Sequence, residues 1–536
     1  MVYYLLLDIN NKIKKMKQIY LTIFSVMITV LSYSQNSFWT PTTYRGAFPI
    51  TDNTPQTDWT YGWSNWDPQN TQYPTTQMVI NTDVTTDATW SGVIKLQNKV
   101  YVRNGATLTI LPGTIIRGDY NSQGTLIVTR GSRIIADGNV NQPIVFTSNN
   151  PVGSRNEGDW GGLVILGNAI NNQPGGVVNI EGLPPSTNTQ HGGVNDNDNS
   201  GVLRYVRIEF AGIPLEPNKE INGLTFGSVG SLTTVDYVQV SFCGDDSFEW
   251  FGGTVNCKHL ISYSTIDDDF DTDFGYRGKV QFGLAIRNEN LSDAAGDSNC
   301  FESDNDAQGS ASQPLTSPIF SNFTIIGAKG DGTVTLPVGE KFEKAFRLRR
   351  NTATSVFNSI ATGWEKGLSL EGAAVESNIT SGVMNFNSNI LSNFNTGTVC
   401  YTATPNFLSS YFSLNLNDST LTNQDINWVN PFVQIGLTPD YRLNGFSFAA
   451  IGANFPVNIF GNIASVDELD NEYTIYPNPA TNQITVNEKT YIEVMDQNGK
   501  LLVSSFDNQV ELINLPNGVY FVRLNNSKVE KLIIKK

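Results

Sequence analysis

Carboxylates are the residues of this 536-residue chain whose spacing most suggests chemistry, and eleven of them form three short groups. The groups are Asp245, Asp246 and Glu249, then Asp267, Asp268, Asp269, Asp271 and Asp273, then Glu302, Asp304 and Asp306. Carboxylates this close repel one another unless a cation, a proton or a basic side chain neutralises them. Calcium takes about six to eight oxygen ligands. We therefore predict a calcium site, more structural than catalytic, formed by Asp245, Asp246, Asp267, Asp269, Asp271 and Asp273.

The spacing Asp269-x-Asp271-x-Asp273 matches the opening of a calcium-binding loop. It is not an EF-hand, because Phe274 stands where that loop needs Gly and Val280 stands where it needs Glu. A second acidic loop, Asp196-Asn197-Asp198, repeats the pattern weakly. In the alternative interpretation, these carboxylates only cap turns through Asx hydrogen bonds.

Basic residues follow the acidic groups and add a catalytic alternative. The candidate catalytic residues are Asp269, Arg277 and Lys279, since a metal could neutralise a sugar carboxylate while Arg or Lys removes the α-proton. Paired carboxylates could instead hydrolyse a glycosidic bond. Further arginines are expected on neighbouring turns of the fold, namely Arg287, Arg347, Arg349 and Arg350. The simpler interpretation, which we favour, is that Arg277 and Lys279 pair with the carboxylates and hold them in place.

Composition excludes several other classes of function. The chain has 50 acidic and 34 basic residues, a net charge of −16, so a nucleic-acid partner is not expected. Only two histidines are present, His191 and His259, which leaves little material for a catalytic triad or a multi-histidine zinc site. The four cysteines, Cys243, Cys257, Cys300 and Cys400, include no CxxC motif, and their spacing decides neither pairing nor free thiols.

Short strand-like phrases between residues 91 and 460 predict the element that positions these groups. TLTILPGTII (107–116) aligns with TLIVTRGSRI (125–134) at an offset of 18, and YVQVSFCG (237–244) with LISYSTID (260–267) at an offset of 23. The second offset places Asp245-Asp246 on Asp268-Asp269. Such phrases, with Gly and Asn at the corners, favour a right-handed parallel β-helix in an all-β chain. The alternative fold is a jelly-roll sandwich, which would show no repeat between turns.

The N-terminal part predicts export and a cap. Residues 1–34 combine a lysine-rich start, an apolar stretch and small residues, as in a signal peptide, and Met16 is an alternative start. The apolar stretch is too short for a comfortable membrane span, so no transmembrane segment is expected in the mature chain. Residues 35–90 hold five of the nine tryptophans, Trp39, Trp59, Trp63, Trp66 and Trp90, and are expected to cap the open end of the β-helix.

The C-terminal part is a separate unit. An acidic linker (461–472) precedes residues 473–536, whose period-2 alternation and Asn-Gly turns predict a small antiparallel β-sandwich. This unit resembles the C-terminal sorting domain of the type IX secretion system of Bacteroidota. The resemblance rests on Tyr476, Pro477, Asn478 and Pro479, on Gly518, Tyr520 and Arg523, and on the basic end Lys535-Lys536. It implies handling by the type IX machinery, removal of the sorting domain, and release or attachment to surface lipopolysaccharide.

The middle of the chain resembles secreted Bacteroidota β-helix proteins of undefined activity. The motifs that carry this resemblance include GDWGGLVILG (158–167), GDDSFEWFGGTVN (244–256) and DDDFDTDFG (267–275). We therefore expect a secreted or cell-surface protein that contacts glycan or matrix, in the manner of an adhesin, with calcium as the only expected cofactor. The alternative is a polysaccharide lyase or glycoside hydrolase that uses the acidic groove near 245–306.

Overall fold

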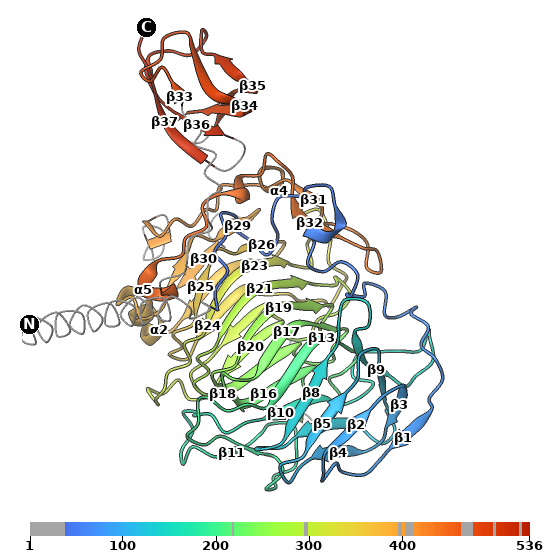
Figure 1. Cartoon of the computed structure of the whole chain (residues 1–536). Helices are drawn as coiled ribbons and strands as arrows, with labels where there is room; N and C mark the ends of the chain where they lie inside the picture. The colour runs from blue at the N-terminus through green and yellow to red at the C-terminus, as the bar shows by residue number, and fades with distance from the viewer. Residues whose placement is uncertain are drawn as a thin grey trace, which may run out of the picture. The chain divides into compact units, whose positions relative to one another are not determined.

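The computed structural model describes residues 38–216, 219–293, 298–394, 399–402, 411–412, 414–461, 475–496, 500–524 and 528–536 (Figure 1). The predicted signal peptide (1–34) and nearly all of the predicted linker (461–472) lie outside these residues. Two compact units are distinguished: a small one, Met1–Pro41 with Phe455–Leu469, and one that holds the rest of the chain. In the small unit, the ring of Phe460, at the end of α5 (Val457–Phe460), meets that of Trp39 at a centroid distance of 4.8 Å.

Two large parallel sheets form the body of the second unit. The ten-stranded sheet contains β4 (Lys99–Val102), β7 (Thr125–Val128), β10 (Gly162–Leu166), β16 (Leu224–Val229), β18 (Phe248–Gly253), β20 (Phe270–Asp273), β22 (Phe301–Ser303), β24 (Lys344–Arg349), β27 (Lys366–Glu371) and β30 (Cys400–Thr402). The sixteen-stranded sheet contains β1 (Met78–Ile80), β2 (Ala88–Trp90), β3 (Val93–Leu96), β5 (Thr107–Ile110), β6 (Ile115–Gly118), β8 (Arg133–Asp137), β9 (Ile144–Ser148), β13 (Gly201–Glu209), β17 (Thr234–Ser241), β19 (Asn256–Tyr263), β21 (Lys279–Ile286), β23 (Ile319–Ile326), β25 (Ser355–Phe357), β26 (Ile360–Thr362), β28 (Phe386–Asn387) and β29 (Ile390–Ser392).

The chain visits these sheets in turn, so that each coil stacks on the one before it (Figure 1). From β16 onward, one strand of the ten-stranded sheet is followed by one long strand, or two short ones, of the sixteen-stranded sheet. Strand pairs between successive coils are parallel, for example β17 with β19 and β18 with β20. The predicted parallel β-helix is therefore confirmed.

Each long strand of the sixteen-stranded sheet bends at one residue in the left-handed region. These residues occupy equivalent positions in successive coils: Tyr205 (φ 50°), Tyr237 (φ 55°), His259 (φ 49°), Phe282 (φ 63°) and Asn322 (φ 61°). Aromatic residues rarely adopt such a φ. Here their rings stack at centroid distances of 4.5, 4.2 and 5.1 Å along the column from Tyr205 to Phe282. The corner column is thus partly aromatic, where only Asn and Gly were expected.

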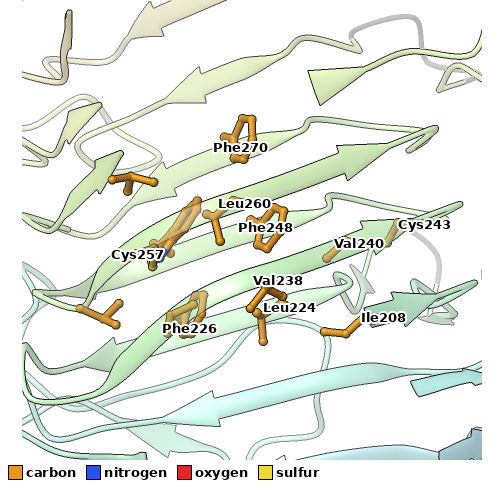
Figure 2. Close-up of a cluster of buried hydrophobic side chains, with 14 of the residues drawn as sticks. Ile208, Leu224, Phe226, Val238, Val240, Cys243, Phe248, Cys257, Leu260 and Phe270 are labelled. Carbon is orange, nitrogen blue, oxygen red and sulfur yellow. The ribbon is translucent and has the colours of Figure 1, made fainter. Parts of the chain in front are cut away.

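Inward side chains build the core as ladders between coils. Figure 2 shows Leu224, Phe248 and Phe270 one above another, and their register places them at equivalent positions of β16, β18 and β20. The Phe248 and Phe270 rings are stacked at 5.6 Å, and Phe301 and Phe346 continue the ladder. Burying each such ring contributes roughly 1.5–3 kcal/mol, so the ladders account for much of the stability.

The register of the coils differs from both predicted offsets. Phe248 pairs with Phe270 and Val238 with Leu260, an offset of 22 residues rather than 23. Likewise Thr107 pairs with Arg133, 26 residues on, whereas TLTI and TLIV belong to different sheets. A slip of one residue turns every side chain to the other face of a strand. The correct offset places Asp246 beside Asp268, and Glu249 beside Asp271.

Segments from both ends of the β-helix cover one flank of the sixteen-stranded sheet. Residues of α4 (Asn423–Ile426), β31 (Trp428–Asn430), β32 (Asp440–Leu443) and η2 (Phe448–Ala450) share one apolar cluster with this sheet, and η1 (Pro55–Thr57) precedes the tryptophans of the flank. Trp63 packs edge-on against Tyr205 and Tyr237, each at 5.9 Å. Trp59 contacts His259 and Trp66 contacts Tyr263, so these three tryptophans line the flank and do not cap the end. Trp90 ends β2 and belongs to the core itself.

Smaller elements decorate the coils. Two hairpins, β11 (Val178–Asn179) with β12 (Gln190–His191) and β14 (Pro214–Glu216) with β15 (Lys219–Glu220), interrupt the coil between β10 and β16, and α2 (Ala373–Thr380) follows β27. All four cysteines are free thiols, and burial raises their pKa values, to about 12 for Cys243 and for Cys400. Within the described part of the chain, no helix is long and apolar enough to span a bilayer.

The C-terminal residues form a small antiparallel domain, as predicted. Its five strands are β33 (Ile475–Tyr476), β34 (Gln483–Met495), β35 (Leu501–Glu511), β36 (Gly518–Leu524) and β37 (Lys528–Ile534). They enclose a separate apolar core that includes Ile484, Val494, Val522 and Leu532.

Candidate cation site on the ten-stranded sheet

The outer face of the ten-stranded sheet carries the acidic groups. Phe248, Trp250, Phe270 and Phe301 point into the core, so the residues that alternate with them face outward. Glu249, Asp271 and Glu302 are paired in register on three successive strands, β18, β20 and β22. All three side chains are half-buried. The fold therefore stacks three carboxylates in one outward column.

Two carboxylate clusters form at the start of this column. The carboxylate oxygens of Asp245, Asp246 and Asp267 lie within 4.8 Å of one another, and so do those of Asp246, Glu249 and Asp271. Asp246 is shared, so the two clusters are continuous. Glu249 was missing from the predicted ligands, because the offset of 23 paired Asp246 with Asp269 and hid the alignment of Glu249 with Asp271.

Crowding changes the protonation of these groups. Burial raises the pKa of Asp246 well above its ordinary range, and repulsion from Asp245 and Asp267 raises it further. Burial together with Asp271 does the same for Glu249. The pKa of Asp271 is raised by burial and by Glu302, against the opposing effect of Arg349. This cluster can therefore hold protons above the pH at which carboxylates ordinarily lose them, or exchange those protons for a divalent cation.

Two of the predicted ligands lie apart from the clusters. Asp269 is fully buried, and one of its oxygens accepts a hydrogen bond at 2.9 Å from Arg287 Nε, whose side chain is equally buried. The other oxygen accepts a hydrogen bond from Ser262. Asp273 accepts a hydrogen bond from the Phe274 N–H at 2.6 Å, and burial raises its pKa. Since Asp269 is enclosed, it is in no position to act on a substrate.

Asp268 and Asp246 also serve the backbone of the next coil. Asp246 Oδ1 accepts a hydrogen bond from the Asp268 N–H at 2.8 Å, and Asp268 Oδ1 accepts one from the Asn299 N–H at 2.6 Å. These bonds tie three successive coils together at the same corner. Turn capping was the alternative role for the acidic residues. Asp246 therefore combines this role with membership of both clusters.

Of the two basic candidates, Arg277 is engaged in an ion pair and Lys279 is positioned through its backbone. Arg277 pairs with Asp196 at 2.7 Å, which joins the loop after β12 to the turn after β20. The Lys279 N–H donates to Asn256 Oδ1 at 2.9 Å, at the start of β21. Asp198 accepts hydrogen bonds from Asn168 and Ser200, so the second acidic loop caps turns.

Further along the column, arginines neutralise the last carboxylates. Arg347 pairs with Glu302 at 2.9 Å, while Arg349 and Arg350 pair with Asp304 at 2.8 and 2.6 Å. Asp306 caps a turn by accepting hydrogen bonds from the Gln308 and Ser310 N–H groups. Within three coils, the outer face thus changes from clustered carboxylates to carboxylates that pair with arginines.

An insertion forms a wall beside the clusters. The insertion consists of the segments on either side of β13, and its residues Ile180, Leu183 and Ile221 pack on Val164 and Phe251 of the outer face. At the edge of this cover, Asn222 donates a hydrogen bond to Glu249. The acidic clusters therefore begin where the apolar cover ends. Sequence reasoning missed Asn222, since nothing in the sequence pairs it with a residue 27 positions on.

Comparison with known proteins agrees with this architecture. Residues 78–430 match the family of pectate-lyase like beta helix domains. The chain belongs to this family. Its residues 474–535 match the secretion system C-terminal sorting domain, which indicates export by the type IX system to the cell surface or the medium. No curated protein matches the chain.

The crystal structure of the Dettilon tailspike protein is similar to this chain. The similarity has a TM-score of 0.25 at 10% sequence identity, and it covers 59% of this chain and 62% of the tailspike chain.

The sorting-signal residues occupy defined positions in the C-terminal domain. Asn478 lies between Pro477 and Pro479 and bridges to β37, since its side chain donates to the Lys531 carbonyl and accepts from the Ile533 N–H. Tyr520 donates to the Pro516 carbonyl. Arg523 forms a buried ion pair with Glu493, and the other residues of the predicted signal are Tyr476, Gly518, Lys535 and Lys536. The Lys536 N–H donates to Asn517, which anchors the basic end.

Proposed function

We propose that this chain is an exported β-helix protein that contacts glycan at the cell surface or in the surrounding matrix, and that calcium occupies the clusters around Asp246. The observation that carries the proposal is the pair of carboxylate clusters sharing Asp246 on an outer face of the β-helix. Burial and mutual repulsion raise the pKa values of Asp246, Glu249 and Asp271, and a divalent cation would remove the repulsion. The sorting domain supports the extracellular location, where calcium is abundant.

A contact role is favoured over catalysis because two of the three predicted catalytic residues, Arg277 and Asp269, are engaged in ion pairs. Arg277 is held by Asp196, and Asp269 is enclosed with Arg287. A lyase would need a base able to reach the α-proton of a sugar bound at the carboxylates. The second candidate function is nevertheless a polysaccharide lyase or hydrolase, which the likeness to pectate-lyase like domains favours.

One experiment separates the two candidates. The purified full chain is incubated with acidic and neutral polysaccharides, in calcium or in chelator, and polymer size and co-elution are followed by gel filtration. We expect calcium-dependent co-elution with unchanged polymer size. Calcium-dependent shortening would establish the enzyme instead, and the absence of both effects on every polymer would refute both candidates.

Calcium binding is measured separately by titration calorimetry. Removing one shared ligand with Asp246→Asn should weaken binding at least tenfold, about 1.4 kcal/mol or more. Asp331→Asn, in an exposed loop where the carboxylate caps only its own turn, is the matched control and should bind calcium as the unmodified chain does. Equal affinity in the two variants would contradict a site at Asp246.

A further inference from the structure

A pocket lies on the outer side of the sixteen-stranded sheet, away from the acidic column. It has a volume of about 590 Å³ and is lined by residues of 286–290, 326–334 and 431–441, together with Tyr263. Its floor is formed by Ile286 and Ile326, which are paired in register at the ends of β21 and β23. A volume of this order is typical of pockets that bind small molecules, roughly 300–1,000 Å³.

The wall formed by residues 431–441 is fixed in place. The Gly436 N–H donates to the Tyr263 hydroxyl at 3.0 Å, and this hydroxyl donates in turn to the Trp66 carbonyl at 3.0 Å. Phe432 packs edge-on against Trp428 at 5.9 Å. The pocket is therefore preformed, which lowers the entropic cost of binding.

The lining combines an aromatic face with planar polar groups. Phe432 keeps 36% of its surface exposed, and Leu437 and Val334 are also exposed. Asn290 and Gln434 are exposed at the same pocket, and Glu289 is half-buried. Carbon–hydrogen faces of a sugar ring pack well on an aromatic ring, while amide and carboxylate groups bond its hydroxyls. These are the two kinds of contact that a saccharide needs.

The charges of the lining residues favour a neutral ligand over an acidic one. Arg287 is the basic residue among the lining residues, and its guanidinium donates hydrogen bonds to Asp269 and to the carbonyls of Thr265 and Asn299. Its side chain is fully buried, with the guanidinium carbon 5.4 Å from the centre of the Trp364 ring. Glu289 adds a negative charge to the lining. An acidic sugar would therefore meet repulsion here without a compensating cation.

We propose that this pocket binds one or two units of a neutral saccharide, with a sugar ring on Phe432 and its hydroxyls bonded by Gln434, Asn290 and Glu289. This inference rests on the proposed contact with glycan and assigns it a site distinct from the calcium clusters. Binding at the pocket requires no calcium, since none of its lining carboxylates belongs to those clusters.

The test uses the full chain, in chelator, with soluble neutral oligosaccharides of glucose, mannose, galactose and xylose. Ligand-observed NMR measures binding, and we expect at least one of these sugars to bind. Phe432→Ala and Gln434→Ala should each weaken that sugar about tenfold. Tyr120→Ala removes another exposed aromatic ring (54%), outside the pocket, and should leave binding unchanged. The thermal midpoint of each variant is measured alongside to show that it is folded.

Three outcomes would overturn the inference. They are the absence of binding by any neutral sugar, binding unchanged in both pocket variants, and equal loss in the Tyr120→Ala control. If an acidic polymer still co-elutes in calcium, the proposed function stands and only the pocket assignment fails. If no polymer of either kind binds, both fail.

Discussion

The two halves of the outer face of the ten-stranded sheet share one backbone geometry and carry opposite chemistry. One outward column runs without a break in register through Tyr101, Ile127, Val164, Thr225, Glu249, Asp271, Glu302 and Arg347. In the early coils the column is mostly apolar and is covered by the insertion on either side of β13. In the later coils it is acidic and half-buried.

This difference shows that the stacking of the coils constrains the inward side chains and leaves the outward ones variable. Stacking demands inward side chains of matching size, so Leu224, Phe248 and Phe270 are constrained by the core. Outward positions only need to suit what covers them, and an insertion can cover one stretch while leaving the next to ions or ligands. A site can therefore be placed on a β-helix by changing one outward column and the length of one loop.

The largest effect is expected from placing a carboxylate on the covered half. Val164 is 1% exposed and packs beneath Ile180 and Leu183 of the insertion. Val164→Glu would bury a carboxylate without a partner, so we expect the free energy of unfolding to fall by about 3–5 kcal/mol. Denaturant unfolding measures this, and hydrogen exchange of residues 178–191 should speed up as the insertion loosens.

The control is Val164→Thr, which keeps the shape of the side chain and adds only a hydroxyl. It should cost less than half as much. A loss below about 1 kcal/mol for Val164→Glu would mean that the early coils are not sealed, and the contrast between the two halves would disappear.

A smaller effect is expected from pH on the open half. The folded state raises the pKa values of Asp246 and Glu249 above their ordinary values of 3.8 and 4.5. Above those values the folded chain binds more protons than the unfolded chain, so the free energy of unfolding falls as pH rises toward the raised values. In chelator, the thermal midpoint should therefore be higher at pH 5 than at pH 8, and calcium should restore it at pH 8.

Other groups titrate in the same range, so a variant isolates the cluster. Glu249→Gln removes one repelling carboxylate and keeps its shape, and it should raise the midpoint at pH 8 in chelator while flattening the pH dependence. If Glu249→Gln instead steepens the dependence or lowers the midpoint, the carboxylates are not in mutual repulsion.

The fold was predictable because its signal is local. Recurring strand-like phrases with Gly and Asn at their ends predicted the parallel coils, and the motifs around Tyr476 and Gly518 predicted the sorting domain. The register between coils was not predictable, because three consecutive aspartates at 267–269 allow two alignments with Asp245-Asp246. Matching YVQVSFCG (237–244) to LISYSTID (260–267) by letter favoured the wrong one, whereas the structure pairs Val238 with Leu260.

That single residue of slip explains most of what was missed at the site. With the offset of 23, Asp269 appeared to share a face with Asp246, and Glu249 had no acidic partner. In the structure Asp269 lies inside with Arg287, and Glu249 joins Asp271. Contacts with the insertion, such as that of Asn222 with Glu249, depend on how a loop folds over a neighbouring coil, which no periodicity reports.

The smallest effect is expected from Arg277→Ala, at the border between the two halves. Arg277 and Asp196 are 21% and 40% exposed, and pairs this open to water contribute at most about 1 kcal/mol. The Ile170 N–H also holds Asp196 at 3.1 Å, so the loop should stay in place. We expect a change in the free energy of unfolding below 1 kcal/mol and unchanged calcium affinity. Loss of a calcium-dependent shortening of polysaccharide in this variant, with stability preserved, would instead give Arg277 a catalytic role and turn the open half into an active site.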